Sequence, residues 1–76
     1  MSPEKLVYMA NQIGRFFVHE GEDKAAASTA DHLVKFWDPR MRETILKHLD
    51  EGGVGLDPIP LKAVKMLKEK SAAAAV

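Results

Sequence analysis

The chain has 76 residues, no cysteine, and 11 basic against 11 acidic side chains, which gives a formal net charge of zero. This length allows only one domain, the lack of cysteine excludes disulfides and thiolate metal sites, and the balanced charge argues against a nucleic-acid partner. No window approaches the ~20 apolar residues of a membrane span, and the residues after Met1 lack the apolar segment of a signal peptide. We therefore expect one small cytoplasmic domain without a nucleic-acid or membrane partner.

The small size limits how much stability the chain can supply for itself. A domain of this length buries roughly 60% of the surface that its unfolded chain exposes, and its core contributes about 3–5 kcal/mol. Without disulfides, the remaining sources of stability are regular helix packing, self-association and docking onto another protein.

A first helix is predicted from the Ser2-Pro3 pair to about Glu20. Ser2 can accept a hydrogen bond from a backbone N–H group that has no helical partner, and Pro3 in the first turn loses no needed donor. Apolar residues then recur every three or four positions and form one face, namely Leu6, Met9, Ile13 and Phe16 or Phe17. Gly21 is the expected stop signal for this helix.

A second, alanine-rich helix is predicted from Asp23 to about Phe36. The residues expected on its inner face are Ala26, Ala30, Leu33 and Trp37, with Ala27 and Val34 beside them. Small side chains let a neighbouring helix approach closely. The first helix is a candidate for that neighbour, because Gly14 in its middle costs about 1 kcal/mol unless another helix packs there.

Two Asp-Pro pairs predict the starts of a third and a fourth helix, because Asp is a good N-cap and Pro fits the first turn. These pairs are Asp38-Pro39 and Asp57-Pro58, and Gly52-Gly53 between them ends the third helix. The apolar stripes that follow are Met41, Ile45 and Leu49 in one segment and Leu61, Val64 and Leu67 in the other. Pro60 falls at the third helical position, where its missing N–H group has no helical partner to lose.

No segment shows sustained alternation of apolar and polar residues, so no strand is expected. The predicted fold class is all-α, a small bundle of about four short helices joined by short loops. Residues 1–70 form the single helical domain, and the alanine-rich tail at 71–76 is expected to fray.

The residue patterns of catalytic and metal sites do not occur in the sequence. His19, His32 and His48 lack the spacing of zinc ligands, so an interface or capping role is the favoured interpretation of His32. The glycine-rich turn at 52–55 follows a helix and lacks the GK[ST] ending of a phosphate-binding loop. We therefore expect no enzyme activity, metal or cofactor in this chain.

The segment 36–42, Phe-Trp-Asp-Pro-Arg-Met-Arg, is the strongest candidate for a partner interface. Trp and Arg are the residues most often found at interface hot spots. Adjacent Phe36 and Trp37 point about 100° apart on a helix, so one is expected in the core and the other at the rim or in a partner. The alternative is that both close the bundle around the turn. Arg40 and Arg42 are solvated in the simplest interpretation, and Arg40 has Asp38 and Glu43 as nearby candidates for an ion pair.

A polar pair, Asn11-Gln12, interrupts the otherwise amphipathic first helix. Solvent exposure is its default interpretation, and an interface that satisfies both amides is the alternative. The predicted partner interface therefore comprises Asn11, Gln12, Phe17, His32, Phe36, Trp37, Arg40 and Arg42.

Three groups of residues resemble the delta subunit of NAD-dependent formate dehydrogenase. They are Tyr8-Met9-Ala10-Asn11-Gln12-Ile13 with Phe16-Phe17, then Asp31-His32-Leu33 with Lys35-Phe36-Trp37-Asp38-Pro39-Arg40-Met41-Arg42, and finally Gly53-Val54-Gly55-Leu56-Asp57-Pro58. The resemblance runs in order from about Leu6 to Leu67, and Lys-Phe-Trp-Asp-Pro-Arg-Met is its most specific element.

The resemblance implies an accessory subunit of a cytoplasmic complex that interconverts formate and carbon dioxide with NAD. It also implies that the partner subunits hold molybdopterin with molybdenum or tungsten, iron–sulfur clusters and FMN, while this chain has no redox centre. The expected partner is the catalytic subunit, and the expected role is in its assembly, cofactor maturation or stability. A permanent subunit and a transient maturation factor both fit, and a free-standing homodimeric interaction or regulatory protein is the alternative.

Overall fold

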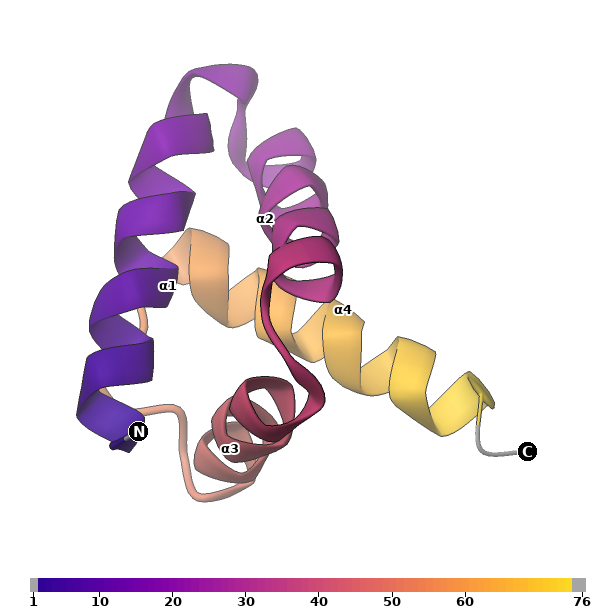
Figure 1. The fold of residues 1–76 in the computed structure, drawn as a ribbon. Helices are drawn as coiled ribbons and strands as arrows, with labels where there is room; N and C mark the ends of the chain where they lie inside the picture. The colour runs from indigo at the N-terminus through magenta and orange to yellow at the C-terminus, as the bar shows by residue number, and fades with distance from the viewer. Residues whose placement is uncertain (1, 75–76) are drawn as a thin grey trace.

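The computed structural model describes residues 2–74, with side chains described for residues 2–70. The elements are α1 (Pro3–Phe17), the 3-10 turn η1 (Val18–Glu20), α2 (Glu22–Phe36), α3 (Pro39–Asp50) and α4 (Pro58–Ala74). Because the described residues contain four helices and no strand, the predicted all-α class is confirmed (Figure 1).

The helices are arranged in two layers around a small core. The first two helices stand side by side as an antiparallel pair joined by η1, and α4 crosses behind both of them (Figure 1). The contact between α2 and α4 is the most extensive in the molecule, and α3 packs on both α1 and α4. One side of the α1–α2 pair is therefore covered by α4, and within residues 2–74 no helix lies across the opposite side (Figure 1).

The helix starts follow the local signals in the sequence. The Ser2 hydroxyl accepts a hydrogen bond from the Lys5 N–H group at 3.3 Å, and the Asp38 carboxylate accepts one from Met41 at 2.9 Å. The end of α1 differs from the prediction, because the α-helix stops at Phe17 and residues 18–20 tighten into a 3-10 turn. Gly21, with a φ of 91°, then turns the chain into α2.

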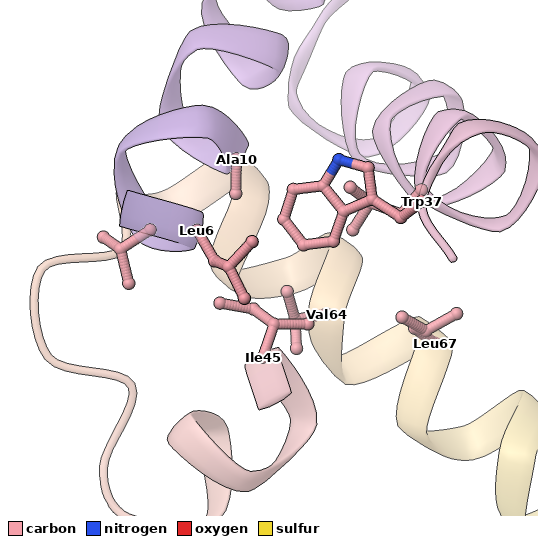
Figure 2. Close-up of a cluster of buried hydrophobic side chains, with 8 residues drawn as sticks. Leu6, Ala10, Trp37, Ile45, Val64 and Leu67 are labelled. Atoms are coloured by element: carbon pink, nitrogen blue, oxygen red, sulfur yellow. The ribbon is translucent and has the colours of Figure 1, made fainter. Parts of the chain in front are cut away.

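The core draws apolar side chains from all four helices. Its buried members are Leu6, Val7, Ala10, Leu33, Trp37, Ile45, Val64 and Leu67. Figure 2 shows the Trp37 ring close to side chains from several helices. The predicted inner face of α2 is confirmed, because Ala26, Ala30, Leu33 and Trp37 are all buried.

The predicted buried face of α1 is partly wrong. Its buried residues are Leu6, Val7, Ala10 and Gly14. Met9 and Ile13 lie only at the edge of the core, and the Phe16 side chain is 73% exposed. Both sets of residues recur every three or four positions, so helical periodicity alone did not distinguish them.

Close helix packing explains why small residues such as Ala10 and Gly14 lie on the buried face of α1. A Cβ atom at Gly14 would lie 2.8 Å from the Cδ atom of Pro60 and 3.4 Å from Ile59. The close neighbour of Gly14 is therefore the start of α4, not the α2 helix that the sequence suggested. Ala25, Ala26 and Ala30 of α2 and Ala63 of α4 are likewise buried, and these two helices have the most extensive contact.

Ion pairs at the surface connect α4 to α2 and α3. Lys62 of α4 donates a hydrogen bond to Asp23 of α2, and Lys68 donates one to Asp50 of α3. The hydrogen bond and charge of Lys62 lower the pKa of Asp23 below its ordinary value. Because a lowered carboxyl pKa favours the folded state above the unfolded pKa, this contribution is lost as the pH falls through the folded pKa. Solvent screens the pair, since both groups are exposed.

The α4 helix continues through Ala74, past the predicted domain boundary at residue 70. Residues 75 and 76 lie outside the described residues, so the fraying of the tail stays a prediction.

We expect Gly14→Ala to lower the free energy of unfolding by about 1–2 kcal/mol, because the added methyl overlaps the rigid Pro60 ring. Urea denaturation followed by circular dichroism measures the change. The matched control is Ala27→Gly at an exposed position of α2, which reports the intrinsic alanine–glycine difference of about 1 kcal/mol. If Gly14→Ala stabilises the protein by the amount that the control costs, the close approach is wrong.

Candidate protein-interaction surface

Asn11 connects α1 to the loop before α4. Its amide nitrogen donates a hydrogen bond to the Gly55 carbonyl at 2.9 Å, and its amide oxygen accepts one from the Asp57 N–H group at 2.9 Å. The loop is held from the other side by His48, whose Nε2 lies 2.8 Å from the Val54 carbonyl. Both functional groups of the Asn11 amide are therefore used inside the chain, and its assignment to the partner interface stays a prediction.

Arg42 also has a structural role. Its Nη1 donates hydrogen bonds to the carbonyls of Val34, at 3.2 Å, and Trp37. Carbonyls in the last turn of a helix have no helical partner, and a cation at that end is favoured by the helix dipole. Arg42 thus caps the end of α2, and its assignment to the partner interface stays a prediction.

The adjacent aromatics Phe36 and Trp37 divide between core and surface, as predicted. The Trp37 side chain is only 4% exposed, whereas that of Phe36 is 71% exposed. The backbone explains the division, because Trp37 follows the last residue of α2 and adopts an extended conformation with ψ of 139°. Trp37 therefore packs in the core, and Phe36 is the mostly exposed aromatic of the pair.

An aromatic row runs across α1 and α2. The His32 ring lies 4.5 Å from the Phe36 ring, with 33° between their planes, and 6.5 Å from the Phe17 ring. Phe16 packs edge-on against Phe17 at 5.1 Å. Three of the predicted interface residues, Phe17, His32 and Phe36, are thus brought together.

Two open hollows flank this row. The first, of about 400 Å³, is lined by Tyr8, Met9, Gln12, Ile13, His32, Phe36, Trp37 and Met41. The second, of about 290 Å³, is lined by Phe17, Ser28, Asp31, His32, Lys35 and Phe36. We call the first hollow the α1–α2 groove, because these two helices form its walls. The two hollows share His32 and Phe36, so they form one continuous surface.

Gln12 lies on the α1 wall of this groove. Its amide donates a 2.8 Å hydrogen bond to the Tyr8 hydroxyl, and both side chains remain exposed. The Tyr8 side chain is 63% exposed, although the sequence alone did not suggest it as an interface residue. The signal was present in the spacing, because Tyr8, Gln12 and Phe16 recur at four residues and therefore share one face of α1.

Arg40 lies exposed on α3, beyond the Met41 end of the groove. Within residues 2–70, its side chain forms no ion pair with either Asp38 or Glu43. The eight predicted interface residues therefore divide in two. Gln12, His32 and Phe36 line the groove, Phe17 lines the adjoining hollow and Arg40 is exposed on α3, whereas Asn11, Trp37 and Arg42 make contacts that hold the fold together.

The described residues bring few reactive side chains together at a single site. His19 lies exposed in η1, His32 lies in the aromatic row and His48 holds the loop before α4. Within residues 2–70, no three histidine, aspartate or glutamate side chains come together as metal ligands would. The concentration of exposed aromatic side chains is the feature that distinguishes this surface.

A family model described as the NADH-dependent formate dehydrogenase delta subunit, FdsD, matches residues 5–64 of the chain. The chain belongs to this family. The matched residues include α1, α2, α3 and the first half of α4, so they contain the whole groove and most of the core. Comparisons with curated proteins and with solved structures gave no match. None of the helices within the described part of the delta-subunit chain is long and apolar enough to cross a membrane.

We expect Asn11→Ala to lower the free energy of unfolding by about 1–3 kcal/mol, because two hydrogen bonds to the loop are lost. The neighbouring change Gln12→Ala serves as the control and should cost less than about 0.5 kcal/mol, since its bond to Tyr8 is exposed. Chemical denaturation of the two variants makes the comparison. Equal effects would contradict the structural role of Asn11.

We expect Trp37→Phe to destabilise the chain by about 1–3 kcal/mol, because the smaller ring leaves part of the core unfilled. Phe36→Gln should change stability by less than about 0.5 kcal/mol, because the side chain is mostly exposed and glutamine is a good helix former. Thermal unfolding followed by circular dichroism at 222 nm tests both. A large cost for Phe36→Gln would mean that Phe36 contributes to the core.

Proposed function

We propose that this chain is a non-catalytic accessory subunit that docks on the catalytic subunit of a formate dehydrogenase through the α1–α2 groove. The observation that carries the proposal is the exposure of Tyr8 and Phe36 in the α1–α2 groove, with exposed Phe16 packed on Phe17 of the adjoining hollow, in a chain that belongs to the delta-subunit family. A small domain gains solubility by burying such side chains, so their exposure favours a partner surface.

The proposed role is to support assembly, cofactor maturation or stability of the catalytic subunit in the cytoplasm. In this proposal the partner subunits hold molybdopterin with molybdenum or tungsten, iron–sulfur clusters and FMN, and the delta subunit holds no cofactor. Docking stabilises a partner by mass action, because any protein that binds only the folded state shifts folding toward that state. The same argument applies to a partly assembled subunit that awaits its cofactor.

The central experiment is co-expression of the tagged delta subunit with the large subunits of its formate dehydrogenase. We expect Phe16→Gln combined with Phe36→Gln to weaken binding of the catalytic subunit by about tenfold or more, because aromatic hot spots contribute about 2 kcal/mol or more. The matched control is Val54→Gln, which changes another strongly exposed apolar residue in the loop before α4. If the double variant retains the catalytic subunit as well as Val54→Gln does, the proposed docking surface is wrong.

A second measurement separates a permanent subunit from a maturation factor. If the delta subunit is a permanent component, the purified active complex contains it in a one-to-one ratio with the catalytic subunit. If it acts only during cofactor insertion, the active complex lacks it, and omitting its gene lowers the metal content of the catalytic subunit. Normal yield and metal content without the delta subunit would contradict both roles.

A further inference from the structure

We infer that the protonation state of His32 regulates docking at the α1–α2 groove. The catalytic subunit binds tightly while the imidazole of His32 is neutral, and more weakly once this ring takes up a proton. This regulation rests on the proposed function, because it acts on the same docking surface. It follows from the uncharged lining of the groove, the position of His32 in the aromatic row and the cost of burying a cation.

The lining of the groove contains one group that changes its charge near neutral pH. The lining residues are Tyr8, Met9, Gln12, Ile13, His32, Phe36, Trp37 and Met41. Among these described residues there is no aspartate, glutamate, lysine or arginine, and a tyrosine hydroxyl ordinarily loses its proton only near pH 10. Histidine is the side chain that ordinarily titrates between pH 5 and 8. The state of His32 therefore decides whether this lining carries a charge.

His32 stands where the two hollows meet. It lines both of them together with Phe36, and the residue is half-buried. Its ring lies 4.5 Å from the Phe36 ring, with 33° between the two planes, and 6.5 Å from the Phe17 ring. A partner that packs on Phe36 and fills the groove therefore also covers the imidazole.

The neighbours of His32 on α2 leave its ring nitrogens open to solvent. Within residues 2–70, no hydrogen bond or ion pair involves the His32 ring, and no buried side-chain nitrogen or oxygen lacks a partner. Asp31 and Lys35 line the adjoining hollow, where they form a 3.0 Å ion pair with each other. Their charges balance, so the hollow beside His32 has no net charge while the ring is neutral.

The other elements around His32 do not supply a carboxylate to hold its proton. On α1 the titratable group in the groove is the Tyr8 hydroxyl, which accepts a hydrogen bond within the same helix. In η1, Glu20 accepts a 2.7 Å hydrogen bond from Ser28. The α3 residue in the lining of the groove is Met41, which has no charge. The proton on His32 is therefore exchanged with water and is not fixed by a neighbouring acid.

Covering the groove makes a charge on His32 costly. In the free chain, water reaches the ring, and an aromatic face within about 6 Å, here that of Phe36, stabilises a cation. Burial under an apolar partner surface disfavours the charged form of a histidine. Binding at low pH therefore requires release of one proton. The affinity is complete above the pH range in which histidine titrates, and it falls as the pH drops through that range.

The test uses the tagged delta subunit co-expressed with the large subunits, with the dissociation of the catalytic subunit measured at pH 7.5 and pH 6.0. For the wild type we expect dissociation to be about threefold or more faster at pH 6.0, since one proton changes the affinity by at most about tenfold per pH unit. His32→Phe keeps an aromatic ring in the row but cannot take up a proton. Its two dissociation rates should agree within about 1.5-fold. His32→Gln is a second variant without a titrating ring and should show the same flat response.

The matched control is His19→Gln. His19 is exposed in η1 and lines neither hollow, so this variant should keep the pH dependence of the wild type. Circular dichroism at both pH values checks that each variant is folded. The inference is overturned if the His32 variants keep the pH dependence of the wild type, if His19→Gln loses it, or if the wild type dissociates more slowly at pH 6.0.

The wild-type result also separates this regulation from the proposed function. If the tagged delta subunit retains no catalytic subunit at pH 7.5, the proposed function and the regulation by His32 are both wrong. If it retains the catalytic subunit with the same dissociation rate at both pH values, docking stands and His32 does not regulate it.

Discussion

The close approach of α4 to α1 and α2 is the constraint on which the rest of the structure depends. Gly14 contacts the start of α4 at a distance that leaves no room for a methyl group, and Ala25, Ala26 and Ala30 of α2 and Ala63 of α4 are buried. Among the described residues, Trp37 is the aromatic side chain that joins the buried core cluster. Tyr8, Phe16 and Phe36 are largely exposed, and Tyr8 and Phe36 line the groove.

Polar contacts hold together the segments beside this surface. Asn11 holds the loop that leads into α4, and Arg42 closes the end of α2 directly behind Phe36. These contacts join α1 to the loop before α4, and α3 to the end of α2.

Some features of the predicted interface follow from local helix geometry, whereas others depend on contacts between distant residues. The angle between neighbouring helical residues was enough to predict that Phe36 and Trp37 face different surroundings. It did not indicate that Asn11 bonds to residues more than 40 positions away, or that Arg42 caps the preceding helix. Such partners become visible only when the helices are placed, because hydrogen bonds require atomic contact rather than proximity in sequence.

Local signals in the sequence determined the helical class, the starts at Ser2-Pro3 and Asp38-Pro39, the inner face of α2 and the family. These features depend on caps, helical periodicity and short motifs, which act over a few residues. Tertiary structure alone decided which face of α1 is buried and which helix Gly14 contacts. Two sets of α1 residues share the same helical spacing, so spacing does not decide which set is buried. The close packing of α4 favours the set that contains Ala10 and Gly14. That selection placed the aromatic residues on the surface, because the space between α1 and α4 is too narrow for them.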